Sequence, residues 1–167
     1  MKSLSEIETV SKRSSRAAGF SWGIAEEVGK NIRILEQFGL GGIKNLNYYF
    51  RIIKNKNFDK LHLIKDENKI EKKEFCPIIA GLSFLDQVRS LEVLKEIKFE
   101  KIAYPLLFLP FISRASEIIG KKLELKIDNS IFLLNYNISI FSNTLNLGVI
   151  EIGNSIPSKG TIYFHAN

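Results

Sequence analysis

The opening segment, residues 3–42, carries the signals of two helices joined by a tight turn, and it constrains the fold more than any other part of the chain. Ser3 and Glu6 have the Ser-x-x-Glu spacing of a capping box, in which each side chain accepts a hydrogen bond from a backbone N–H at the helix start. Gly19 can take the positive φ that ends a helix, and Ser21 is placed to cap the next one. The segment therefore predicts a helix, a glycine turn and a second helix.

Apolar residues at helical spacing extend this pattern to a third helix that begins near Gly42. The predicted stripe of the second helix is Ala25, Val28, Ile32 and Leu35, and that of the third is Ile43, Leu46, Phe50 and Ile53. The N-terminal half is therefore predicted to consist of three helices.

The periodicity changes along the second half of the chain. Residues 78–94 have helical spacing and 95–103 alternate like a strand, whereas period-two alternation dominates from Leu123 onward. The later strands are predicted at 131–140, 145–152 and 161–164. We therefore expect an α+β fold, in which a helical N-terminal half of three helices packs with a small, mainly antiparallel sheet from the C-terminal half.

Two stretches leave alternatives open. The lysine-rich residues 54–74 fit either a short hairpin or a solvated loop. We expect residues 1–167 to form a single domain, and an internal junction, if there is one, at 54–74. In the apolar run 104–112, Pro105 suits a first helical turn, and Pro110 either kinks that helix or begins a second one.

Composition argues against several classes of protein. The net charge is +6, but lysines outnumber arginines 18 to 6 and the charge is spread along the chain, whereas a nucleic-acid binder usually concentrates it on one face. A helix-turn-helix role for the first two helices is also disfavoured, because Glu26 and Glu27 would repel the phosphates. No secretory signal or membrane-spanning run is present, so we expect a cytoplasmic protein that binds neither membrane nor nucleic acid.

Several separated blocks resemble a bacterial family known only as a domain of unknown function, number three-seven-two-six. The blocks are Leu4-Ser-Glu-Ile-Glu, Ala18-Gly-Phe-Ser-Trp-Gly-Ile-Ala-Glu-Glu, Cys76-Pro-x-x-Ala-Gly, Asp86 and Pro105-Leu-Leu-x-Leu-Pro-Phe. The resemblance covers roughly residues 3–120. It implies a soluble bacterial protein and brings no reaction, cofactor or catalytic residue.

The second helix carries two candidate features near its start. Trp22 and Gly23 would form a ligand platform at a helix N-terminus, unless Trp22 fills the join between the first helix and the core. Glu26 and Glu27 would suit acid–base catalysis if one were desolvated, and Glu27 is the catalytic candidate. The simpler interpretation is that both complement the helix dipole and that Glu26 pairs with Lys30.

Three further candidates lie downstream. Cys76 precedes a predicted helix, where a thiol can have a lowered pKa and act as a nucleophile, although cysteine is also a common core residue. Asp86 is either a buried acid or the surface partner of Arg89, and Arg114 can bind a carboxylate or phosphate. The single cysteine and two histidines are too widely spaced for a metal signature, so neither metal nor cofactor is predicted.

These residues leave two main hypotheses for function. The preferred one is an accessory or assembly protein of bacterial metabolism that binds a protein partner or itself, because Tyr104–Ile112 and Tyr48-Tyr49-Phe50 offer apolar surface. The alternative is a small-molecule enzyme or ligand-binding protein with a pocket between helices and sheet. That pocket would be lined by Trp22, Glu27, Cys76, Asp86 and Arg114.

Overall fold

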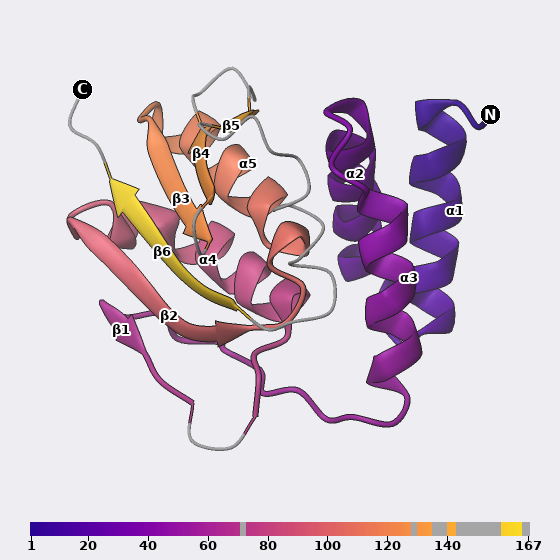
Figure 1. The fold of residues 1–167 in the computed structure, drawn as a ribbon, viewed down its shortest axis with the longest axis horizontal. Coiled ribbons are helices and arrows are strands. Elements are labelled where there is room, and N and C mark those ends of the chain that lie inside the picture. Colours follow the sequence, from indigo (N-terminus) through magenta and orange to yellow (C-terminus); the bar gives the residue numbers. More distant parts are fainter. Residues whose placement is uncertain (71–72, 128–129, 135–139, 143–157, 165–167) are drawn as a thin grey trace.

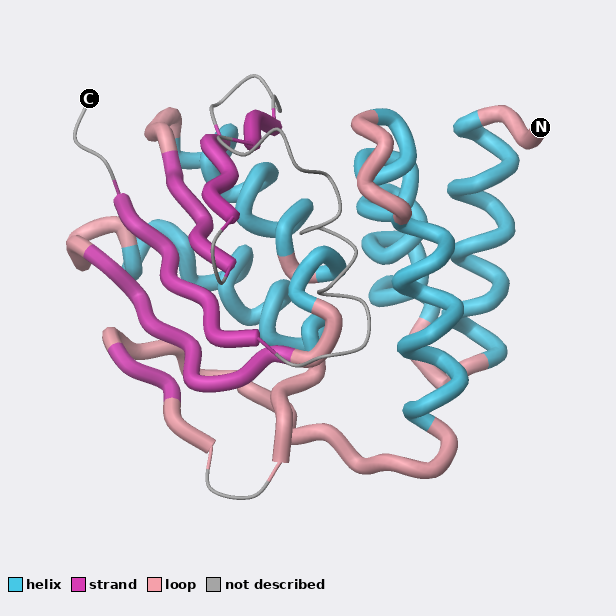
Figure 2. The backbone as a smooth tube through the Cα atoms, in the orientation of Figure 1, coloured by secondary structure: helices cyan, strands magenta, loops and turns pink. Residues whose placement is uncertain are grey.

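The chain forms three layers, with the sheet on one side, α4 and α5 in the middle, and α1, α2 and α3 on the other side (Figures 1 and 2). This computed structural model describes residues 1–70, 73–127, 130–134, 140–142 and 158–164. The middle helices separate the sheet from the N-terminal helices, so the molecule is an α+β protein, as the sequence predicts.

The outer layer consists of α1 (Leu4–Ala17), α2 (Trp22–Gln37) and α3 (Gly42–Ile53). The predicted capping box at Ser3 is present, the Ser21 hydroxyl accepts the Ile24 amide, and Gly19 has φ +102° in the turn. All three predicted helices are therefore confirmed, and their boundaries follow the cap signals.

The buried face of α3 differs from the predicted stripe. Leu46 and Tyr49 are buried, whereas Ile43 is exposed and Phe50 is only partly buried. Because α3 packs against α2 on one side and the end of the middle layer on the other, its inward face is rotated toward Tyr49.

Residues 54–76 form a connection that is mostly irregular. Its one short strand, β1 (Glu67–Asn68), pairs parallel with β2 (Glu96–Ile102) at the edge of the sheet. The connection is therefore the predicted loop and not a local hairpin, since a hairpin would make the two strands antiparallel and adjacent in sequence.

The middle layer contains α4 (Pro77–Leu91) and α5 (Leu109–Ile119). A short 3₁₀ turn, η1 (Pro105–Leu107), precedes α5, and Pro110 lies in the first turn of α5. Pro110 therefore begins a second helical element, where its missing N–H is not needed.

Among the described residues, the sheet has six strands in the order β1-β2-β6-β3-β4-β5, with β3 (Leu123–Ile127), β4 (Ser130–Leu134), β5 (Ile140–Ser142) and β6 (Ser158–Phe164). Every pairing except that of β1 with β2 is antiparallel. The C-terminal strand β6 lies between β2 and β3 (Figure 1). The predicted strand at 145–152 lies outside the described residues.

The core lies mainly where α4 and α5 meet the sheet. Phe108 packs edge-on against Phe99 of β2 and Phe84 of α4, with ring centroids 5.0 and 6.3 Å apart. The whole run from Tyr104 to Ile112 is buried. The expectation that this run forms apolar surface is therefore wrong, because the run supplies core contacts between η1, α5 and the sheet.

Candidate functional site: a cavity beside the first turn

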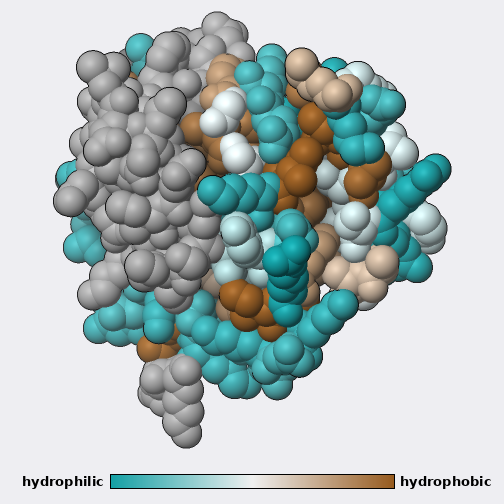
Figure 3. Space-filling view, turned by 45° about the vertical axis from the view of Figure 1, so that its right-hand side comes forward, coloured by the Kyte–Doolittle hydropathy of each residue, from teal (hydrophilic) through white to brown (hydrophobic). Residues whose placement is uncertain are grey.

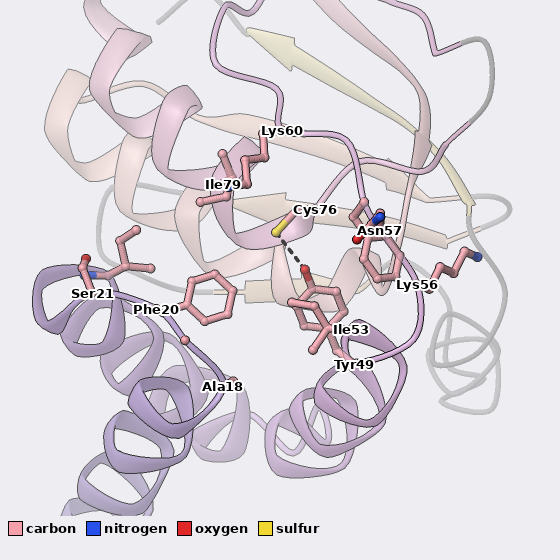
Figure 4. A pocket seen from close by; sticks show the side chains of 13 residues that line it. Ala18, Phe20, Ser21, Tyr49, Ile53, Lys56, Asn57, Lys60, Cys76 and Ile79 are labelled. Atoms are coloured by element: carbon pink, nitrogen blue, oxygen red, sulfur yellow. Dashed lines mark hydrogen bonds between the residues drawn. The ribbon is translucent and has the colours of Figure 1, made fainter.

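A cavity of about 330 Å³, the junction cavity, lies where three helices meet the 54–60 loop (Figure 4). The α1–α2 turn forms one wall, the end of α3 and the loop form the second, and the start of α4 forms the third. The lining residues are Ala18, Gly19, Phe20, Ser21, Ile24, Tyr49, Ile53, Lys56, Asn57, Phe58, Lys60, Cys76 and Ile79.

Backbone hydrogen bonds fix the loop and the start of α4 relative to each other. The amide of Asp59 donates to the Glu74 carbonyl at 2.8 Å, and the amide of Cys76 donates to the Asp59 carbonyl at 2.9 Å. Phe75 exchanges hydrogen bonds with Lys101 and Ala103 at the end of β2. The far end of the sheet thus holds Cys76 in place at the N-terminus of α4.

The Tyr49 hydroxyl donates a hydrogen bond of 2.8 Å to Cys76 Sγ, which joins α3 to the start of α4 (Figure 4). Cys76 is only 4% exposed. Burial raises the pKa of the Cys76 thiol, while the Tyr49 hydroxyl, the first-turn amides of Ile79 and Ile78, and the Lys60 charge lower it less strongly. The pKa direction is thus opposite to the lowered value considered for Cys76 from the sequence, and the buried thiol is a protonated hydrogen-bond partner of Tyr49.

Aromatic rings enclose the Tyr49 side chain behind the cavity. Its ring lies 5.3 Å from Phe58 and 5.8 Å, edge-on, from Tyr104. Burial raises the pKa of the Tyr49 hydroxyl above its usual range, so the group remains a neutral donor. Tyr104 has a left-handed φ of +48°, which is costly for a non-glycine residue and fixes its ring against Tyr49.

The two lysines that line the cavity have different roles. Lys56 Nζ lies 2.5 Å from the Oε1 atom of the largely buried Glu74, and its side chain extends away from Cys76 (Figure 4). Lys60 lies beside Ile79 and has no ion pair within the described part of the chain. Since none of the thirteen lining residues is acidic, the rim carries a positive charge that no lining group neutralises.

Trp22 and Gly23 lie on the outside of the same turn and do not line the cavity. The indole is 58% exposed, with the Arg16 guanidinium carbon 4.6 Å and Lys12 Nζ 5.6 Å from its ring centroid. Trp22 is thus neither core nor cavity wall, but a surface ring held by cation–π contacts.

Glu27 and Arg114 are the two predicted site residues that the structure brings together, in a salt bridge between α2 and α5. Both side chains are largely buried, at 23% and 21% exposed, and Arg114 also donates to Asn31 Oδ1 at 3.3 Å. Glu26 points outward and pairs with Lys12 rather than with Lys30, which instead pairs with Glu27. The Glu27–Arg114 pair therefore fastens the outer helices to the middle layer, away from the junction cavity.

Asp86 is exposed on α4, and the five residues predicted to line a pocket between helices and sheet do not come together in the junction cavity. Of its members, only Cys76 lines the junction cavity. The residues that sequence reasoning missed are Tyr49 and Lys60. The spacing of Tyr49 from Leu46 and Ile53 places a hydroxyl on an apolar helix face, where it needs a buried partner, and this was the signal available.

Two absences hold for the part of the chain that the structure describes. There, no group of three or more His, Cys, Asp or Glu side chains is arranged to hold a metal ion. None of the helices found there is both long and apolar enough to cross a bilayer.

Comparison with known proteins supports the resemblance noted from the sequence. Residues 2–76 match a family described as "Protein of unknown function (DUF3726)". The match includes α1, α2, α3 and the connection as far as Cys76, and the blocks at Asp86 and Pro105 lie beyond it. No curated protein and no solved structure is significantly similar to the chain.

Proposed function

We propose that the protein binds a small organic molecule in the junction cavity. The observation that carries the proposal is the cavity itself, whose walls combine apolar side chains with polar ones. Its volume of about 330 Å³ is at the lower end of the range typical of ligand sites. Phe20, Ile24 and Ile79 supply apolar contact, and Asn57 and Lys60 supply polar atoms.

The location of the cavity supports the same proposal. Twelve of the thirteen lining residues fall within the segment that matches the family, and only Ile79 lies beyond it. The cavity is thus built almost wholly from the part of the chain shared with other proteins. Binding rather than catalysis is proposed, because the cysteine that lines the cavity has a raised pKa.

The preferred hypothesis from sequence, an interaction protein, loses its main argument because Tyr104–Ile112 and Tyr49 are buried. On the face shown in Figure 3, apolar side chains alternate with hydrophilic ones. Trp22 still favours self-association as a second candidate, since an exposed indole is a frequent interface residue. Sedimentation velocity tests it: a dimer that the Trp22→Ser variant converts to a monomer supports it, and a wild-type monomer at all concentrations contradicts it.

A fragment screen tests the binding proposal. Ligand-observed NMR is run with the wild type, with Ile79→Trp, which fills the cavity, and with the control Ile118→Trp on an exposed site of α5. We expect fragments that bind the wild type and the control but not Ile79→Trp. If no fragment distinguishes these proteins, the proposal is wrong.

Cys76 gives a second readout that needs no variant. Because it is the only cysteine, alkylation by iodoacetamide produces one modification that mass spectrometry can follow. Because Cys76 is buried, alkylation requires the protein to open, and a fragment that binds the folded cavity should slow it. Unchanged rates for every fragment would contradict binding beside Cys76.

A further inference from the structure

The charges around the junction cavity are unbalanced. Two lysines and no acidic residue line it; of these two lysines Glu74 pairs with Lys56, and the same carboxylate also lies 3.9 Å from Lys101 Nζ. Lys60 is left facing solvent at the rim, without an ion pair among the described residues. A ligand that brings one negative charge to this rim would balance it.

The start of α4 adds a second preference for negative charge at the same place. Pro77 has no N–H, and the first backbone bond of the helix runs from Ala80 to the Cys76 carbonyl. The amides of Ile78 and Ile79 lie against the Cys76 sulfur and favour negative charge there, and of these two residues only Ile79 lines the cavity. A 15-residue helix directs the positive end of its dipole toward this position.

The rest of the cavity determines the remainder of the ligand. Phe20, Ile24, Ile53 and Phe58 present apolar surface opposite the start of α4. Of the two lysines that line the cavity, only Lys60 lacks an ion pair among the described residues, and no arginine lines it. The charge balance therefore suits a single carboxylate better than a phosphate dianion.

We infer that the ligand of the junction cavity is a monocarboxylate with an apolar body, whose carboxylate binds Lys60 beside the start of α4. This inference rests on the proposed function. In this arrangement the apolar body lies between Phe20 and Ile79 on opposite walls (Figure 4). The ligand thus has its charged end at the rim and its apolar end inside.

The test uses matched acids and neutral amides as probes. Hexanoate and phenylacetate are titrated into ¹⁵N-labelled protein, followed by hexanamide and phenylacetamide, which have the same bodies without the charge. We expect the acids to shift the amide signals of Ile78 and Ile79 and to bind about tenfold more tightly than the amides, a difference of about 1.4 kcal/mol. Inorganic phosphate, which has charge but no apolar body, should bind more weakly than either acid.

Two lysine variants locate the charge. Lys60→Gln should weaken binding of the acids by about tenfold and leave the amides unaffected, because only the acids have a charge to lose. Lys54→Gln is the matched control, since Lys54 is exposed in the same stretch but does not line the cavity. It should bind both kinds of probe like the wild type.

The outcomes separate this inference from the proposed function. Amides that bind as tightly as acids, an unchanged Lys60→Gln, or phosphate that binds as tightly as hexanoate would overturn the monocarboxylate. If fragments still bind in an Ile79→Trp-sensitive manner, the proposed function stands with another ligand class. If neither the fragments nor these probes occupy the cavity, both fail.

Discussion

Gly81 of α4 packs directly against Phe111 of α5, and replacing it with alanine should destabilise the protein. A Cβ atom at Gly81 would lie 2.0 Å from Phe111 Cδ2, whereas ordinary contact begins near 3.4 Å. The ring or the helix would have to move by about 1.4 Å. Phe111 is fully buried, so no solvent-facing space is available for that movement.

The expected magnitude combines two opposing effects. Overpacking of a tight core costs about 1–3 kcal/mol, and this contact belongs at the upper end of that range. Replacing a helical glycine with alanine raises the helix propensity, which stabilises the folded state by about 1 kcal/mol. Gly81→Ala should therefore lower the free energy of unfolding by about 2 kcal/mol, or the Tm by about 4–8 °C for a chain of this length.

Gly23→Ala is the matched control, because the same atom is added to a helix where nothing lies within 4 Å. It should stabilise the protein by up to about 1 kcal/mol, or leave it unchanged. Urea unfolding followed by circular dichroism measures both variants. A Gly81→Ala protein as stable as the wild type would show that α4 and α5 do not pack as described here.

Two further predictions concern charged and titratable groups. Glu27→Gln leaves the largely buried Arg114 without its carboxylate, so it should lower the free energy of unfolding by about 1–2 kcal/mol in urea titrations. Glu26→Gln, at an exposed pair, should have no measurable effect. Equal effects of the two variants would contradict the role given to the α2–α5 salt bridge. Burial raises the folded-state pKa of Cys76 above its unfolded value of about 8.5, so the unfolded chain loses its thiol proton first as the pH rises. The free energy of unfolding should therefore fall above about pH 8.5, by at most about 1.4 kcal/mol per pH unit. Cys76→Ala should flatten this pH dependence between about pH 8.5 and 9.5, below the range where deprotonation of Tyr49 also lowers the free energy of unfolding. An unchanged slope would contradict a raised thiol pKa.

Local signals in the sequence determined the helices and most strand positions. The capping box at Ser3, the turn at Gly19 and the cap at Ser21 act between residues at most a few positions apart, so they are readable in the chain itself. The same is true of the strand-like alternation in β2 and β3. The family resemblance over α1–α3 was likewise visible from short blocks of sequence.

Only the tertiary structure decided how these elements meet. Strand β6 enters the sheet between β2 and β3, and α3 turns Tyr49 rather than Ile43 inward, because packing partners distant in sequence determine which face is buried. The junction cavity gathers residues from 18 to 79, and its central contact joins Tyr49 to Cys76 across 27 positions. No local pattern encodes such a contact, because it exists only once the helices and the loop pack against one another.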